Sequence, residues 1–365
     1  MRRISYVAGF VLLACLLISA LPRVWYRESP YGSELPRRAL LPAQVQDQLK
    51  AYVRDTSHYA ESQQVVAIHN EEIVFEEGDV KRLINCHSAR KSIMSLLIGI
   101  AREKGFLRLD ESLGQLGIDE SKTPLTPQEK SATIRDLLMA RSGVYLPAEA
   151  ETDFAKANRP RREQYKPGEF FFYNNFDFNV LGAILEQKTG RSIGEFMEEY
   201  LARPLEMQDF SASHVVYGNP WPVRDDKSDY RVYWMYLSAR DLARVGAMVA
   251  QRGLWKGKQV VSAEWIREST GAYTTTLDES MWPFDGYGYL WWMDKDNNTI
   301  WADGYGGQFL LIDTTRNLAI AQRNFTGNSL LTSGLFMIRK RKRHGGRVHL
   351  MHIYDLIKGY VDEDK

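Results

Sequence analysis

The chain has 365 residues and a mass of 42.0 kDa, which is long enough to bury a sizeable core. With 44% hydrophobic and 25% charged residues it is too apolar to be disordered throughout, and 47 Lys+Arg against 46 Asp+Glu argue against a strongly basic nucleic-acid-binding protein. Two cysteines, Cys15 and Cys86, exclude a disulfide scaffold, and the seven histidines form no zinc motif. We therefore expect no metal and no other cofactor.

The N-terminus is a targeting segment by its composition. Two arginines precede an apolar run over residues 4–21, which predicts a signal anchor or a cleaved signal peptide within residues 1–24. A lipobox-like stretch ending at Cys15 adds lipidation as a third reading. The charges before the run place the rest of the chain outside the cytoplasmic membrane. The expected location is the inner membrane with a periplasmic catalytic domain, or the periplasm after cleavage.

The next segments change from helical to strand periodicity. Residues 25–60 read as a linker followed by a helix over 42–59, and residues 61–106 as two β-rich runs about a polar turn and then a buried helix over 88–103. Residues 107–235 are largely helical and irregular. The helices expected there cover 133–140, 178–189 and 193–201.

Strand signals return in residues 236–338. After helices over 239–252 and 263–269, four short strands are predicted at 287–293, 299–302, 308–313 and 318–322. This order predicts an α/β (α+β) fold in which an antiparallel sheet draws strands from both ends of the chain. Helices flank the sheet, and residues 107–235 form an inserted all-helical subdomain.

Residues 339–365 are expected to form a basic loop and a C-terminal helix. The basic run from Arg339 to Arg347 contains six arginines or lysines. It reads either as a solvated loop or as a contact for anionic lipid headgroups or another polyanion.

A Ser-x-x-Lys at the start of the helix over 88–103 is the first motif that can carry chemistry. No Gly-x-Ser-x-Gly and no phosphate-binding loop occur in the chain. Positions i and i+3 share a helix face, so Lys91 can approach the hydroxyl of Ser88. A serine needs a base, and a lysine serves as one only if its pKa is depressed.

A Tyr-x-Asn lies 85 residues downstream of the serine, in the segment from Pro167 to Asn175. The phenol of Tyr173 can relay a proton to a leaving group, and the amide of Asn175 can hydrogen-bond Lys91 or a substrate carbonyl. A second Tyr-x-Asn at 217–219 lacks the aromatic approach and reads as a turn. Whether Lys91 or the Tyr173 phenolate is the resting base stays open, because the two would titrate as a coupled pair.

With these motifs in order, the chain resembles the serine β-lactamase and penicillin-binding-protein superfamily, in particular the β-lactamase-related branch with class C enzymes, esterases and 6-aminohexanoate-dimer hydrolases. Further similar stretches are Leu137–Gly143, Tyr165–Gly168 and Arg203–Met207. The resemblance implies a β-lactamase/transpeptidase-like fold and catalytic roles for Ser88, Lys91 and Tyr173.

The third family motif is where the sequence departs. Lys188-Thr189-Gly190 spells it but sits at a helix end, so we interpret it as a helix C-cap. The equivalent is Ala302-Asp303-Gly304, followed by Tyr305-Gly306-Gly307-Gln308. The resemblance implies that Gly304, Tyr305 and Gly306 bind substrate and that the backbone N–H groups of Ser88 and Tyr305 form an oxyanion hole.

Ala302 replaces a lysine that helps β-lactam-active relatives bind a carboxylate. Asp303 either faces solvent or favours an amine or a neutral ester.

The combined reading is a serine hydrolase that cleaves a small-molecule ester or amide through a Ser88 acyl-enzyme. Two alternatives stay open: a β-lactamase or D,D-peptidase acting on cell-wall peptides, and a non-catalytic ligand-binding sensor. The expected partners are the substrate and, through the N-terminal anchor, the cytoplasmic membrane; no nucleic acid is expected, and the sequence does not indicate an oligomeric state.

Overall fold

The computed structural model describes residues 21–55, 64–218, 227–277, 283–339 and 346–364. In this part of the chain no helix combines the length and apolarity needed to cross a bilayer. The predicted membrane segment, apart from Leu21, and Cys15 lie outside the described residues, so the structure does not test them.

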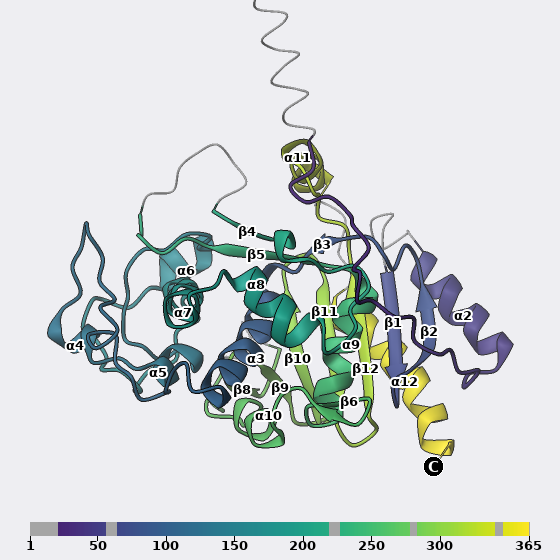
Figure 1. The fold of residues 1–365 in the computed structure, drawn as a ribbon. Helices are drawn as coiled ribbons and strands as arrows, with labels where there is room; N and C mark the ends of the chain where they lie inside the picture. The colour runs from purple at the N-terminus through teal and green to yellow at the C-terminus, as the bar shows by residue number, and fades with distance from the viewer. Residues whose placement is uncertain (1–20, 56–63, 219–226, 278–282, 340–345, 365) are drawn as a thin grey trace, which may run out of the picture.

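The centre of the fold is a seven-stranded antiparallel sheet that takes strands from both ends of the chain, as predicted (Figure 1). Its strand order is β2-β1-β12-β11-β10-β9-β8. The early hairpin is β1 (Gln64–His69) and β2 (Glu72–Glu77), and the late strands are β8 (Gly286–Tyr287), β9 (Trp292–Asp294), β10 (Thr299–Gly304), β11 (Gln308–Asp313) and β12 (Leu318–Arg323). β1 pairs with β12 from Gln64↔Arg323 to His69↔Leu318, which joins the two ends of the chain.

Helices cover the sheet, and this explains why its central strands are apolar along their whole length. α9 (Ala239–Ala250) packs on β12, β1 and β11, and α12 (Arg347–Glu363) packs on β12. Every residue of β1, β11 and β12 is buried. α2 (Ala43–Arg54) lies on β2 and contacts α12 through the stacked rings of Tyr52 and His349. Burial from two sides is therefore the source of the strands' continuous hydrophobic runs.

The helical region is built around two long helices. α3 (Arg90–Glu103) follows a short 3₁₀ turn, His87–Ala89, and packs against α7 (Asn175–Thr189). α7 begins three residues before its predicted start, because Asn174 caps it by accepting a hydrogen bond from the Phe176 N–H. The other elements are α4 (Pro127–Lys130), α5 (Ile134–Leu138), α6 (Asp153–Asn158), α8 (Ile193–Met197), a π-helical turn (Glu198–Ala202), a 3₁₀ turn (Ala212–His214) and α10 (Ala263–Ser269).

Two parts of the strand assignment need correction. The strand predicted over 287–293 is two short strands, because Gly288 and Leu290, with φ of 63° at the leucine, turn the chain between β8 and β9. A small second sheet, in the order β3-β5-β4, is formed by β3 (Ile84–Asn85), β4 (Val215–Tyr217) and β5 (Tyr233–Leu237). The inserted region is thus not all helical: β4 and the start of β5 come from it. Runs this short carry too little periodicity to reveal their pairing.

Two elements complete the fold. A two-stranded hairpin follows α9, with β6 (Leu254–Trp255) and β7 (Lys258–Gln259). α11 (Leu330–Arg339) stands off from the sheet beside the first described residues (Figure 1). The basic segment predicted as a loop between the last two helices falls mostly outside the described residues.

Candidate active site

The Ser-x-x-Lys sits where the small sheet meets the first long helix. After β3, the Cys86 N–H donates to the carbonyl oxygen of Met235 at 2.8 Å, and the His87 N–H donates to Asn85 Oδ1 at 2.8 Å. His87 has a φ of 47°, in the left-handed region that a residue with a Cβ seldom adopts. This turn places Ser88 directly ahead of α3, at the wall of a cavity.

Lys91 lies against the hydroxyl of Ser88, with 2.8 Å between Lys91 Nζ and Ser88 Oγ. The lysine is buried, and its Nζ is 4.9 Å and 4.8 Å from the ring centres of Tyr173 and Phe178. Burial, reinforced by the positive charge of Arg90, lowers the pKa of Lys91 well below its usual value, while Asp303 acts in the opposite direction. A neutral amine in this position can accept the serine proton.

Tyr173 is also hydrogen-bonded to Ser88. Burial raises the pKa of the phenol, and the hydrogen bond to Ser88 only partly offsets that effect. The ring stacks on Trp292 with 5.6 Å between the ring centres. Tyr173 is therefore held as a neutral phenol, a proton donor, beside the hydroxyl that Lys91 contacts.

The end of β10 closely approaches the turn that carries Ser88. A Cβ at Gly304 would lie 2.4 Å from the Cys86 carbonyl oxygen and 3.0 Å from the Ala89 nitrogen, so a side chain cannot fit there. Tyr305 lines the same cavity as Ser88, and its ring centre is 5.5 Å from that of His87. Gly306 has a φ of 77° and supports the turn to β11.

Asp303 lines the same cavity. Of the two predicted orientations, toward solvent at the sheet edge or toward the site, the structure therefore has the second. Burial raises the pKa of this carboxyl to about 6, and the charges of Arg347 and Lys91 oppose that increase. Ala302, in the place of the family's lysine, is buried. The charged group presented by this strand is therefore an acid.

The cavity holds about 700 Å³, and aromatic side chains form much of its wall. Ser88, Tyr173, Asp303 and Tyr305 contribute to its wall together with Phe170, Phe171, Phe172, Phe284 and Trp292. Arg141 and Glu169 add charged groups, and Arg141 is engaged by Thr274 Oγ1 at 3.1 Å and by the Tyr273 carbonyl oxygen at 3.0 Å. A small acyl compound fits a cavity of this size.

Comparison with known proteins identifies the family and the fold. A family model described as beta-lactamase matches residues 54–322. The chain belongs to the beta-lactamase family.

Among its relatives, an uncharacterized protein of Alkalihalophilus pseudofirmus is 24% identical over 72% of this chain and 82% of that protein.

Solved structures show the same fold. A Bacillus anthracis protein assigned as a 6-aminohexanoate-dimer hydrolase has 18% identity and a TM-score of 0.59, covering 86% of this chain and 90% of its own. A family VIII carboxylesterase has 17% identity and a TM-score of 0.57, covering 81% of this chain and 93% of its own. The protein therefore has a beta-lactamase-family serine hydrolase fold with amide-hydrolase and carboxylesterase neighbours.

Asn175 was also predicted as a site residue, but its side chain hydrogen-bonds to the insertion. Its amide donates to the carbonyl oxygen of Ala150, a residue with a φ of 61°. It thereby stabilises a left-handed turn of the insertion. Any contact of Asn175 with a substrate carbonyl remains a prediction.

The two false motif matches compare differently with their predictions: the first ends a helix, as predicted, whereas the tyrosine of the second, predicted as a turn, lies on a strand. Gly190 ends α7 in the left-handed conformation, with φ of 67°, and Lys188 pairs with Glu111 at 2.6 Å between Nζ and Oε1. Tyr217 lies on β4 and donates its hydroxyl proton to Glu186. Asn219 lies outside the described residues.

Sequence reasoning missed a buried arginine that holds the turn carrying Ser88. Arg323, at the end of β12, donates from Nη2 to the Ile84 carbonyl oxygen at 2.5 Å and from Nε to Gln308 Oε1 at 2.8 Å; its Nη1 is 3.4 Å from Cys86 Sγ. His87, whose Nε2 is 2.8 Å from Thr326 Oγ1, has its pKa lowered to about 3 by burial and by nearby cations. It is therefore a neutral packing residue.

Proposed function

We propose that the protein is a serine hydrolase that cleaves small esters or amides through an acyl-enzyme on Ser88. The observation that carries this proposal is the 2.8 Å contact between Lys91 Nζ and Ser88 Oγ, at a lysine whose pKa burial holds well below its usual value. Such a lysine removes the main obstacle to serine catalysis, which is the high pKa of the hydroxyl.

Acylation begins as Ser88 Oγ attacks the substrate carbonyl and its proton passes to Lys91 Nζ. The backbone N–H groups of Ser88 and Tyr305 donate to the oxyanion of the tetrahedral intermediate. When the intermediate collapses, the bond to the leaving group breaks and that group takes the phenolic proton of Tyr173, which regains a proton from the Lys91 ammonium. The raised pKa of Tyr173 and the lowered pKa of Lys91 make the last transfer downhill.

Deacylation repeats the steps with water as the nucleophile. Lys91 takes a proton from water, the hydroxide adds to the acyl carbon, and the Ser88–acyl bond breaks with return of the proton to Ser88 Oγ. The products are the carboxylic acid and the free serine. Lys91, with its neutral resting amine, is the base in this scheme, and Tyr173 is the proton relay.

The substrate class follows from the charge in the cavity. Asp303 is a carboxyl in the cavity wall, and Ala302 offers no cation to bind a substrate carboxylate. A neutral or amine-bearing ester or amide suits this wall better than a β-lactam with its own carboxylate. A β-lactamase or D,D-peptidase is the second candidate, supported by the family itself, and rapid acylation of Ser88 by a labelled penicillin would favour it.

We also propose that the N-terminal run anchors the chain in the inner membrane with the catalytic domain in the periplasm, or directs it there if the run is cleaved. The support is the composition of residues 2–21, with arginines ahead of the apolar stretch.

The decisive test is labelling with a fluorophosphonate followed by peptide mass spectrometry. We expect one adduct on Ser88, no adduct and no p-nitrophenyl ester hydrolysis in Ser88→Ala, and normal labelling in Ser95→Ala. Ser95 lies buried on the same helix, and its hydroxyl has no hydrogen-bond partner among the described residues, so it is a matched control. Ligand binding without an adduct or turnover would indicate the sensor alternative.

A further inference from the structure

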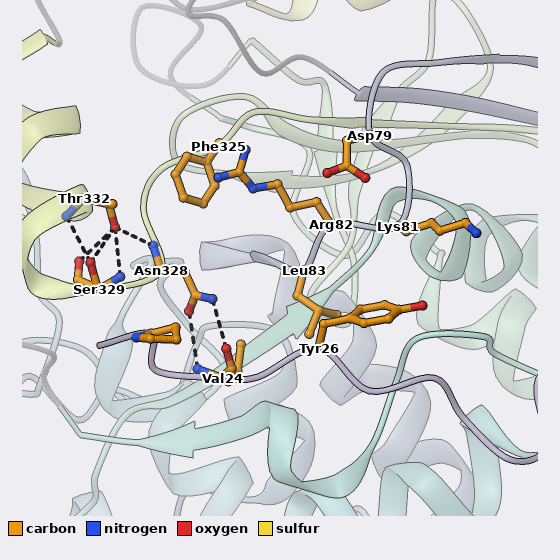
Figure 2. A pocket seen from close by; sticks show the side chains of 11 residues that line it. Val24, Tyr26, Asp79, Lys81, Arg82, Leu83, Phe325, Asn328, Ser329 and Thr332 are labelled. Carbon is orange, nitrogen blue, oxygen red and sulfur yellow. Dashed lines mark hydrogen bonds between the residues drawn. The ribbon is translucent and has the colours of Figure 1, made fainter. Parts of the chain in front are cut away.

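Three segments that are distant in sequence meet on a surface outside the catalytic cavity. The Arg23 N–H donates to the Asn328 carbonyl oxygen at 2.6 Å. The Asn328 side chain also holds Val24: its Nδ2 donates to the Val24 carbonyl oxygen at 3.1 Å, and the Val24 N–H donates to its Oδ1 at 3.4 Å (Figure 2). The residues that directly follow the apolar run are thus bonded to the loop that opens α11.

A pocket of about 590 Å³ lies at this junction. One wall comes from the N-terminal segment with Val24 and Tyr26, another from the start of α11, and a third from the loop 79–83 (Figure 2). Lys81 and Arg82 from this loop are exposed, and the pocket lining contains one carboxylate, that of Asp79. Among the described residues, no ion pair involves either cation. The Arg82 guanidinium carbon lies 3.5 Å from the ring centre of Phe325, so its apolar face is covered and its N–H edge is left for an anion.

Large apolar side chains are exposed around this pocket. Trp25 is 69% exposed and Leu21 56%, and Leu331 and Leu335, one turn apart on α11, are 44% exposed each. Phe336, on another side of α11, is buried, with its ring centre 6.2 Å from that of Tyr305. The helix therefore packs against the edge of the active site and presents a pair of leucines to its surroundings. The sequence then continues into the basic run Arg339–Arg343.

We propose that this surface, made of residues 21–26, the loop 79–83 and α11, rests on an anionic phospholipid bilayer. Lys81 and Arg82 contact lipid phosphates, and Trp25, Leu331 and Leu335 enter the interface. The combination of an apolar run, an aromatic residue just beyond it, exposed leucines and adjacent basic residues matches the layers of a membrane surface, from hydrocarbon through the interface to the headgroups. The proposal rests on the proposed membrane location and not on the hydrolytic reaction. The proposed contact would also place the catalytic cavity close to the membrane, because Phe336 of α11 packs against Tyr305 in the cavity wall.

Hydrogen–deuterium exchange on the full chain in lipid nanodiscs tests the proposal. We expect the amides of α11 to exchange about tenfold more slowly in discs of phosphatidylcholine mixed with phosphatidylglycerol than in discs of phosphatidylcholine alone. The variant Leu331→Ser/Leu335→Ser should lose this protection. Lys81→Gln/Arg82→Gln should reduce it about fivefold or more, and it provides a second test if the leucine variant folds poorly.

The matched control is Leu254→Ser, because Leu254 is 41% exposed but belongs to the β6–β7 hairpin. It should retain full protection of α11. Equal exchange in the two kinds of disc, or protection that survives both double variants, would overturn the proposal. Failure of the chain to stay with either disc would overturn it together with the membrane location, whereas fluorophosphonate labelling of Ser88 on the same samples reports separately on the hydrolase.

Discussion

Two clusters of buried charged groups in this protein are built in opposite ways. At the start of α9, Arg240 donates to Asp209 from Nε at 2.6 Å and from Nη2 at 2.5 Å. Asp241 accepts hydrogen bonds from the N–H groups of Gln208 and Asp209, at 2.7 Å and 2.9 Å. Arg244 donates to the Leu205 carbonyl oxygen at 3.1 Å. Each of these charges has a hydrogen-bonded partner, and the cluster ties α9 to the segment before β4.

In the cluster at Ser88, no ion pair among the described residues involves Lys91 or Asp303. Lys91 contacts a hydroxyl and two aromatic rings, and the carboxyl of Asp303 opens on the cavity. Burial moves the pKa of both groups toward their neutral forms, as it also does for Asp241 and Arg244, so the two clusters differ in their bonding partners and not in the direction of these shifts. Buried charges that are hydrogen-bonded to an opposite charge, such as Arg240 and Asp209, hold the fold, whereas desolvated groups outside such a direct ion pair can exchange protons with a substrate.

The largest effect is expected for Lys91→Met, which tests the catalytic half of this comparison. Loss of the base should lower kcat/KM for a p-nitrophenyl ester by about 10²–10⁴-fold. The melting temperature should stay the same or rise, since the substitution removes a group whose charged form burial disfavours. Lys188→Met, in the false motif at the end of α7, should leave kcat/KM unchanged. A Lys91→Met variant with parental activity would contradict the assignment of the base.

Arg240→Met tests the structural half. It leaves Asp209 buried without its bidentate partner, so the free energy of unfolding should fall by about 3–5 kcal/mol. Denaturant unfolding measures this change, and Ser88 in the folded fraction should still react with fluorophosphonate. The control is Arg37→Met, whose pair with Glu76 is largely exposed and should cost about 1 kcal/mol or less. Equal losses of unfolding free energy in Arg240→Met and Arg37→Met would contradict the structural role assigned to the buried pair.

The smallest effect is expected for Asp303→Asn. The activity should rise with pH as Lys91 loses its proton, and the negative charge of Asp303 raises the pKa of Lys91. Removing that charge lowers the lysine pKa, so the rising limb of kcat/KM should move to lower pH. The difference should appear above pH about 6, where Asp303 is ionised, and fade below it. Glu169→Gln, another carboxyl at the cavity, should not move the limb; a limb unmoved in Asp303→Asn would exclude coupling to Lys91.

Much of the fold and site could be predicted because the relevant signals are local. The polar turn at Asn70–Glu71 between two β-rich runs predicted the β1–β2 hairpin, and the spacing of Ser88 and Lys91 predicted their contact across one helical turn. The Lys188-Thr189-Gly190 match could be rejected for the same reason, since its place at a helix end indicated a glycine C-cap.

Other features depend on partners far away in the chain. Asn175 follows Tyr173 by two residues, yet its side-chain amide donates a hydrogen bond to the carbonyl oxygen of Ala150. Nothing in the sequence near Arg323 indicates that it would reach Ile84 and Cys86, more than 230 residues earlier. The β3-β5-β4 sheet joins runs of two to five residues from separate regions, and strands this short become recognisable only by their pairing.

By itself, the sequence determined the order of the elements and the types of residue at the site, since periodicity, caps and short motifs are properties of neighbouring residues. The tertiary structure decided which of those residues face the cavity and how their pKa values shift. Lys91 can serve as the proposed base because burial, reinforced by the charge of Arg90, depresses its pKa. An aspartate becomes the charge of the cavity wall because β10 turns it toward Ser88. Burial and electrostatic coupling act through space, so only the folded chain defines them.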